Sequence, residues 1–334
     1  MIKRGLNSKL AEVGKIKIGR KAEKVTKTKN GKEFQMPEKL DYFLITTTER
    51  DASKNLIINH EIMDRLPKDK NGKIRELRIR LPFDSVDKNF FTQYQYYAGR
   101  HRVCSVDGVE AERIFRQAGK QVLPFEDGDK EIEVKQGEVK KIKCDPSTCI
   151  FSTSGKCKVS GILSTFLPDA KDLGGIYKFR THSYNSVASI DGSLKYYAEQ
   201  TGGVLQHMPL KLVMIKKTTE DHGNIDYVTV VVDGDKIYGL RKAAMEEVQS
   251  RKMLGVNITA LEEQAERSGF FRDTDPEDVV QEEFYPENET EEISEPVNVT
   301  PKNQAEEIKQ KLDEPKKTEE KPVGQRTTGD EELF

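Results

Sequence analysis

The stretch CDPSTCIFSTSGKC (residues 144–157) contains three of the four cysteines of the chain, and the fourth, Cys104, precedes it. The spacing is Cys144-x4-Cys149-x7-Cys157, with proline, glycine and hydroxyl residues between the cysteines that favour tight turns. Cysteines of an intracellular chain are more often metal ligands or plain thiols than disulfides. Four thiolates match a closed tetrahedral zinc site, which is a structural kind of site.

We therefore predict a structural Zn²⁺ held by Cys104, Cys144, Cys149 and Cys157. His101 is an alternative to Cys104 as the fourth ligand, and unligated thiols or another metal are alternatives to zinc. Four lysines, at positions 141, 143, 156 and 158, flank the cluster and would offset its negative charge.

The sequence lacks the residue patterns that carry enzymatic chemistry. Its five histidines, at positions 60, 101, 182, 207 and 222, form no HxH or HExxH motif, and there is no GxxxxGK[ST], GxGxxG or GxSxG motif. In THSYNS (181–186) we interpret His182 as a structural hydrogen-bonding residue. We therefore predict a non-catalytic protein, with a metal-dependent hydrolase or nuclease as a rival that would need an open metal site.

Charge divides the chain into a basic body and an acidic tail. Residues 272–334 contain 20 acidic and 8 basic residues, which leaves 37 acidic and 47 basic residues in residues 1–271. The tail also has few aromatic residues and scattered prolines, so we predict that it is disordered. The body, residues 1–271, is predicted to be folded, either as one domain or as two subdomains that meet near residues 104–160. Such an uneven charge favours a nucleic acid or a charged protein partner.

Hydrophobic periodicity predicts strands and helices without a regular βαβ alternation, which favours an α+β fold. The predicted strands lie at residues 14–19, 40–49, 74–83, 131–144 and 175–184, with a hairpin around EDHGN. Helices are predicted at residues 55–66, 185–203, 238–252 and 257–268, and a further helix is predicted to begin after the DG turn at 107–108. The aromatic stretch 88–104 is interpreted as a half-buried strand or helix face, with base stacking as the alternative. The start of the chain lacks the apolar core of a signal peptide, and no run of 18 apolar residues occurs, so we expect a cytoplasmic protein.

Several segments in the same order resemble the recombination directionality factor-like family of phages and integrated elements, whose members are partners of large serine integrases. The matching segments are LAEVGKIKIG (10–19), PEKLDYFLITTTE (37–49), CSVDGVEAER (104–113), the cysteine cluster, YKFRTHSYNSVASIDGSL (177–194) and TGGVLQHMPLKLVMIKK (201–217). The sequence departs from the family at Lys15 and Lys17, where arginines are usual, and at Val106.

The resemblance implies a regulator that has no chemistry of its own. Such a factor binds the integrase on its attachment-site DNA, at the zinc-ribbon and coiled-coil region of the integrase, and switches recombination from integration to excision. It implies a bacterial host cell, no small-molecule substrate and no membrane, and it leaves direct DNA contact open. The exposed positions around Arg180 to Asn185 and the 205–208 turn are candidates for the integrase surface.

The alternative function is a phage single-stranded DNA-binding or annealing protein, or another accessory protein of replication. It is favoured by the basic body, by the aromatic stretch and by the terminal GDEELF (329–334), which resembles the acidic, phenylalanine-ended tails of bacterial single-strand binding proteins. A frayed chain end is the simpler interpretation of that terminus.

Overall fold

The computed structural model describes residues 11–27, 33–52, 55–98, 101–106, 109–118, 121–124, 138–170, 175–219, 223–234 and 236–268. These residues all belong to one compact unit, Met1–Glu289. The second unit, Thr290–Phe334, and the predicted acidic tail from residue 272 onward lie outside the described residues. No helix in the described ranges is both long and apolar enough to span a membrane.

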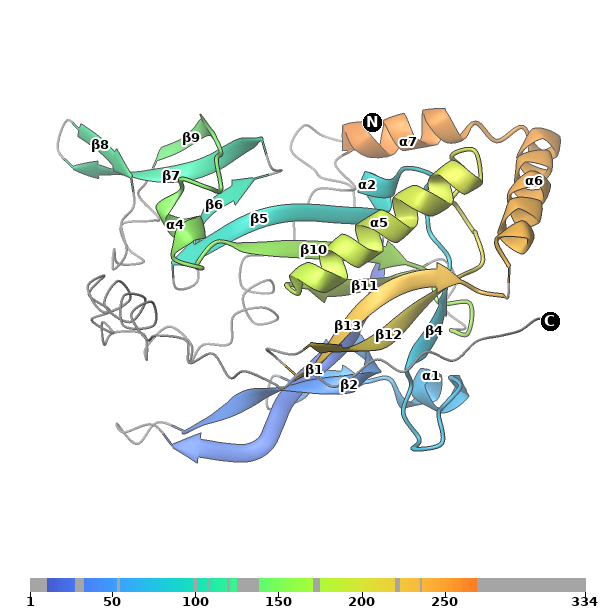
Figure 1. The fold of residues 1–334 in the computed structure, drawn as a ribbon, viewed down its shortest axis with the longest axis horizontal. Coiled ribbons are helices and arrows are strands. Elements are labelled where there is room, and N and C mark those ends of the chain that lie inside the picture. The colour runs from blue at the N-terminus through green and yellow to red at the C-terminus, as the bar shows by residue number, and fades with distance from the viewer. Residues whose placement is uncertain are drawn as a thin grey trace, which may run out of the picture. The chain divides into compact units, whose positions relative to one another are not determined.

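A large sheet of ten strands forms the framework of the body, with the order β3-β2-β1-β11-β10-β5-β6-β7-β8 and with β9 paired to β7 (Figure 1). The strands are β1 (Glu12–Lys27), β2 (Glu33–Arg50), β3 (Leu56–Ile58), β5 (Phe90–Ala98), β6 (His101–Val106), β7 (Glu110–Ala118), β8 (Gln121–Pro124), β9 (Glu138–Lys143), β10 (Lys158–Thr165) and β11 (Ile176–Thr181). Only the β1–β11 pair is parallel among the pairings of these strands. The fold is therefore the mixed α+β class that the sequence predicts.

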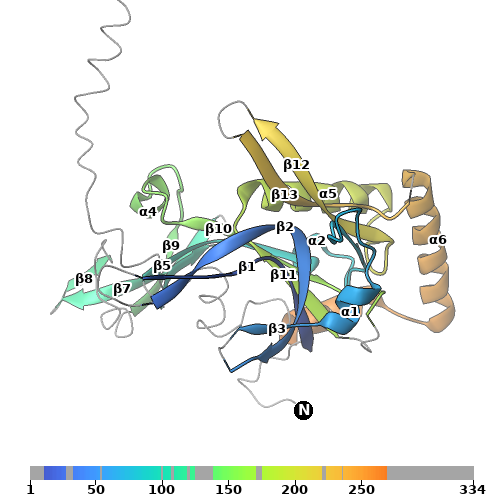
Figure 2. The same cartoon turned by 90° about the horizontal axis from the view of Figure 1, so that it is seen from below.

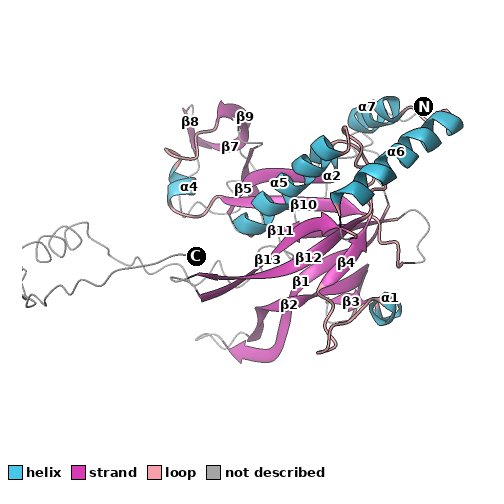
Figure 3. Cartoon of the chain, turned by 45° about the vertical axis from the view of Figure 1, so that its right-hand side comes forward, coloured by secondary structure: helices cyan, strands magenta, loops and turns pink. Residues whose placement is uncertain are grey.

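A smaller antiparallel sheet has the order β13-β12-β4, and its β12–β13 hairpin extends away from the large sheet (Figure 2). Its strands are β4 (Glu76–Ile79), β12 (Leu210–Thr219) and β13 (Gly223–Val232). The helices are α1 (His60–Arg65), α2 (Val86–Asn89), α4 (Ile150–Thr153), α5 (Tyr184–Gln200), α6 (Ile237–Leu254) and α7 (Ile258–Ser268). Figure 1 and Figure 3 show α5 lying along the strands, with α6 and α7 at their margin.

The main hydrophobic core lies on the face of the large sheet that carries α5. Ile16 on β1 is paired with Ile45 on β2 and Phe179 on β11, and all three side chains are buried. Ile190 and Leu194 of α5 belong to the same core, together with apolar residues of the smaller sheet. Because strand side chains alternate between faces, this arrangement explains the period-two pattern of the N-terminal strands.

Two predicted elements differ from the structure. Residues 55–66 form the short strand β3 followed by α1, rather than one helix. The side chain of Asn59 accepts a hydrogen bond from the backbone N–H of Ile62, so the helix begins there and not earlier. The helix predicted after residue 108 is wrong, because Glu110–Ala118 pairs with β6 and β9 as the strand β7.

The remaining predicted elements are confirmed where the structure describes them. The helix at 185–203 corresponds to α5, which is followed by Gly202 and Gly203 at positive φ, a backbone conformation that ends helices. The hairpin corresponds to β12 and β13, and the two later helices to α6 and α7. The aromatic stretch forms β5 and β6, in which Phe90, Tyr96 and Tyr97 are buried.

Candidate functional site

The four cysteines come from four different elements around one end of the large sheet. Cys104 lies on β6, where it is paired with Tyr96 of β5 and Arg113 of β7. Cys144 directly follows β9, and its backbone N–H donates to Val109 O (3.0 Å). The site thus joins chain segments that are far apart in sequence.

The other two cysteines flank the short helix α4. Cys149 is its N-cap residue, and its backbone N–H donates to Asp145 O (3.0 Å). Cys157 precedes β10, and its backbone N–H donates to Phe151 O (2.7 Å). A turn at Gly155, with φ of 73°, reverses the chain between α4 and Cys157. These bonds fold the 144–157 stretch back on itself, as its turn residues predict.

A small second core supports the cysteine cluster. Tyr96, Val103 and Phe151 are buried there, and Cys104, Cys149 and Cys157 pack against them. The Tyr96 and Phe151 rings are stacked with their centroids 4.2 Å apart, and the Arg113 guanidinium lies 4.4 Å from the centre of the Phe151 ring. These contacts fix α4 on the sheet.

The thiols are near enough to influence one another electrostatically. Burial raises the pKa of Cys104 to about 11, opposed by Arg113 and reinforced by Cys144 and Cys149. Burial also raises the pKa of Cys157 to about 12, and the other three thiols contribute to that shift. Burial and the neighbouring thiols therefore favour the protonated forms, Arg113 opposes them at Cys104, and a bound cation would favour the thiolates.

The donor set fits zinc by its chemistry, because the four cysteines form no disulfide and three of them, Cys104, Cys149 and Cys157, pack against one small apolar core. However, no three His, Cys, Asp or Glu side chains in the described ranges are arranged closely enough to hold a metal ion. The side chain of His101 lies outside the described residues, so its place as an alternative ligand is not decided.

Two of the flanking lysines face carboxylates rather than the cysteines. Lys141 Nζ lies 4.0 Å from Glu112 Oε1, and Lys143 is paired in register with Glu110. Lys156 and Lys158 lie in the chain around Cys157. Charge compensation of a zinc–thiolate centre by the four lysines therefore stays a prediction.

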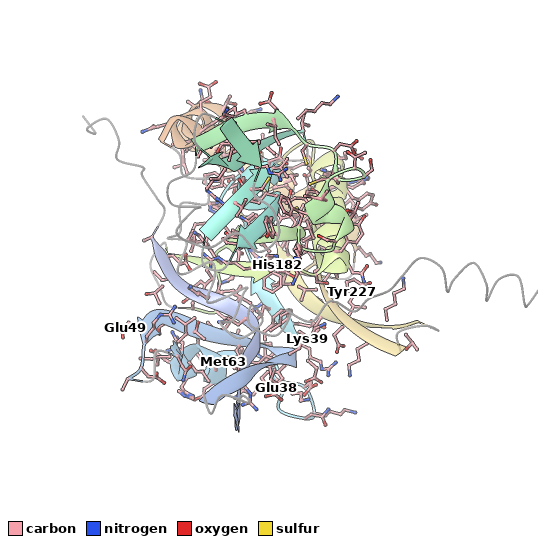
Figure 4. The ribbon with its side chains drawn as sticks, turned by 90° about the vertical axis from the view of Figure 1, so that its left-hand side faces the viewer. Glu38, Lys39, Glu49, Met63, His182 and Tyr227 are labelled. Carbon is pink, nitrogen blue, oxygen red and sulfur yellow. The ribbon has the colours of Figure 1, made fainter. Side chains whose placement is uncertain are left out.

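The predicted integrase surface at residues 180–185 is only partly exposed. Arg180 is buried and its guanidinium lies 3.4 Å from Glu12 Oε2, because alternation on β11 directs it to the sheet face opposite α5. Tyr184 is 68% exposed at the start of α5, and Asn185 beside it is exposed. His182 is half-buried, and its Nδ1 lies 2.7 Å from Val159 O, which agrees with the structural role that we predict (Figure 4).

The 205–208 turn is part of a polar network that the sequence did not reveal. The carboxylate of Asp84 accepts hydrogen bonds from the backbone N–H groups of Leu205 (3.0 Å) and Gln206 (2.8 Å). Arg251 of α6 lies 2.6 Å from the same carboxylate. Burial alone would raise the pKa of Asp84, but the bonds from Arg251, Gln206 and Leu205 lower it overall. Of this turn, His207 is exposed whereas Leu205 and Met208 are buried.

A model of the Gp3-like family, described as recombination directionality factor-like, matches residues 13–234, which is well over half of the chain. The chain belongs to this recombination directionality factor-like family. No curated protein and no solved structure matches it. The matched residues contain all four cysteines and both sheets of the directionality factor-like body, whereas α6 and α7 follow the last matched residue.

Proposed function

We propose that this protein is a recombination directionality factor, which binds a large serine integrase on attachment-site DNA and switches recombination from integration to excision. Membership of the directionality factor-like family across residues 13–234 is the observation that carries the proposal. The basic balance of residues 1–271 supports it, because that charge suits a protein that works beside DNA.

Such a switch requires no catalytic group. The factor only has to bind one integrase–DNA arrangement more tightly than the other. A shift of that equilibrium from 1:99 to 99:1 needs about a 10⁴-fold difference in affinity, or about 5.5 kcal/mol. An interface of ordinary size can supply this difference. We therefore propose a non-enzymatic regulator that binds a protein partner and acts on no small-molecule substrate.

We also propose that Cys104, Cys144, Cys149 and Cys157 hold a structural zinc ion. The cluster joins β6, β9, α4 and the start of β10, so a cation there would link strands that are distant in sequence. With four thiolates no coordination position remains for a reacting water, and the chemistry that zinc supplies is therefore cross-linking of the fold.

The test is a binding experiment with the serine integrase encoded in the same genetic element. A duplex containing one recombinant junction is immobilised, the integrase is loaded, and the full-length protein is added while its retention is measured. We expect retention that depends on the integrase, with far less on the bare duplex. A matched surface with a single-stranded oligonucleotide serves as control. Retention on the single strand without integrase, and none on the integrase complex, would contradict the proposal in favour of a replication role.

A further inference from the structure

A groove of about 460 Å³ lies between the C-terminal end of α5 and the side of α6. It is lined by Gln200, Thr201, Arg241, Ala244, Met245, Val248, Gln249 and Lys252. Figures 1 and 3 show α6 beside the end of α5, at the margin of the strands. The groove lies outside the cysteine cluster, and its α6 wall follows the residues that the family model matches.

Large apolar side chains are exposed around this groove. Met245, on the rim of the groove, is 74% exposed. Tyr238, seven residues earlier on α6, is 72% exposed. Large exposed apolar side chains beside a groove favour an interaction site, and tyrosine and methionine are enriched in protein interfaces. Methionine also adapts its shape to a partner.

The charges in the groove are all of one sign. Among the residues that the structure describes, the charged ones that line the groove are Arg241 and Lys252, and no carboxylate lines it. The guanidinium of Arg241 donates a hydrogen bond to Gln200 Oε1, which fixes its position across the groove. The nearby carboxylates of α6 are paired elsewhere, Glu246 with Lys242 and Glu247 with Arg251. A ligand with a negative charge next to an apolar group is therefore complementary to this site.

The body holds α6 in place, so the groove is pre-formed. Arg251 binds Asp84 through two nitrogen atoms, at 2.6 and 3.0 Å. Glu262 of α7 accepts hydrogen bonds from the backbone N–H groups of Asp84 (2.7 Å) and Ser85 (3.0 Å). Leu240 and Ala244 bury the inner face of α6 in the main core. A rigid binding surface loses less entropy when it binds.

We infer that the α5–α6 groove is a docking site for the integrase, and that it receives a large apolar side chain flanked by carboxylates. This inference rests on the proposed function and deepens it. An apolar rim around two cations favours a protein over DNA, because phosphates gain nothing from Met245 or Tyr238. The α6 wall of this docking site lies beyond the residues that the family model matches.

The test measures the affinity of full-length variants for the integrase, loaded on junction DNA as above. The groove variants are Met245→Asp and the pair Arg241→Glu with Lys252→Glu. The matched controls are Met253→Asp and Lys242→Glu, which alter equally exposed residues of α6 that do not line the groove. We expect the dissociation constant to rise about tenfold or more for the groove variants and to stay within about twofold for the controls. Circular dichroism checks that every variant keeps its helical content.

The possible outcomes separate the inference from the proposed function. Equal affinity of all variants, with normal binding by the wild type, would overturn the docking site and leave the proposed function intact. A loss confined to the charge-reversal pair would also overturn it, because the cations would then contact DNA phosphates. Absence of binding by the wild type would overturn the proposed function and the docking site together.

Discussion

His182 shows how one half-buried side chain couples the stability of the sheet to pH. Its ring is largely surrounded by protein, and Nδ1 donates to Val159 O at 2.7 Å in the neutral form. Burial lowers the pKa of His182 to about 4 from its ordinary value of 6.5, against the effect of the Val159 carbonyl and reinforced by Lys158. The unfolded chain therefore binds a proton at a pH at which the folded protein does not.

The stability of the folded protein therefore falls as the pH falls. The contribution of neutral His182 is fully present above pH 6.5 and is lost as the pH falls toward 4. Replacement by glutamine, His182→Gln, removes this titration. We expect the free energy of unfolding of the wild type to fall by about 3 kcal/mol more than that of the variant between pH 7 and pH 4. Urea denaturation of both proteins at each pH measures this difference. An equal fall in the free energy of unfolding of the two proteins would show that the pKa of His182 is not lowered in the fold.

Alanine substitutions at two glycines, Gly14 and Gly192, are expected to change the free energy of unfolding in opposite directions. A Cβ on Gly14 would lie 2.5 Å from the backbone oxygen of Thr46 and 2.6 Å from the Tyr177 ring, at the crossing of β2, β1 and β11. A Cβ on Gly192, inside α5, would meet nothing within 4 Å. Gly14→Ala should therefore reduce the free energy of unfolding by about 2 kcal/mol or more, whereas Gly192→Ala should raise it by about 0.5–1 kcal/mol. Denaturant titration of both variants measures these free energies. An unchanged free energy of unfolding in Gly14→Ala would contradict the close packing around Gly14.

At the scale of elements, the cysteine lobe is where stability depends most on a cation. Among the residues that the structure describes, the small core beside β6, β7, β9 and α4 is made by three buried apolar residues, Tyr96, Val103 and Phe151. A structural zinc contributes folding free energy directly in such small units.

We expect the purified full-length protein to contain about one zinc ion per chain. Cys149→Ser should reduce that content strongly and lower the thermal midpoint, because one of four ligands is lost. Ser147→Ala is the control, since Ser147 only bonds the neighbouring Asp145 side chain in the same turn. Elemental analysis with thermal denaturation makes the measurement. Full zinc content in Cys149→Ser, or a wild-type protein that neither contains nor takes up zinc, would refute the four-cysteine site.

Local patterns predicted most elements because the deciding interactions are local. The α5 helix has an apolar stripe at Val187, Ile190 and Leu194, and two glycines follow its end. By contrast, the DG turn before residue 110 suggested a helix, and β7 forms there because two neighbouring strands supply its hydrogen bonds. Tertiary pairing of this kind overrides local propensity. The same limit hid the groove, because Arg241 and Gln200 lie on different helices.

At the scale of the whole molecule, the order of the strands is the feature that sequence patterns could not supply. The N-terminal β1 lies between β2 and β11, and the pairing with β11 joins residues more than 150 positions apart. A second long-range contact, from Lys39 Nζ to Asp226 O at 2.8 Å beside Tyr227, links β2 to the smaller sheet (Figure 4). Only the ordered set of family segments carried information at this scale, and the family match covers both sheets.

The central claim is that this protein reverses the direction of a serine integrase without chemistry of its own. The most direct measurement is a pair of recombination reactions with purified integrase, one with the left and right junction sites and one with the unrecombined sites. We expect excision only when the full-length protein is present, suppression of integration in the same concentration range, and saturation near stoichiometric amounts rather than turnover. Unchanged yields in both directions, at concentrations well above that of the integrase, would contradict the account.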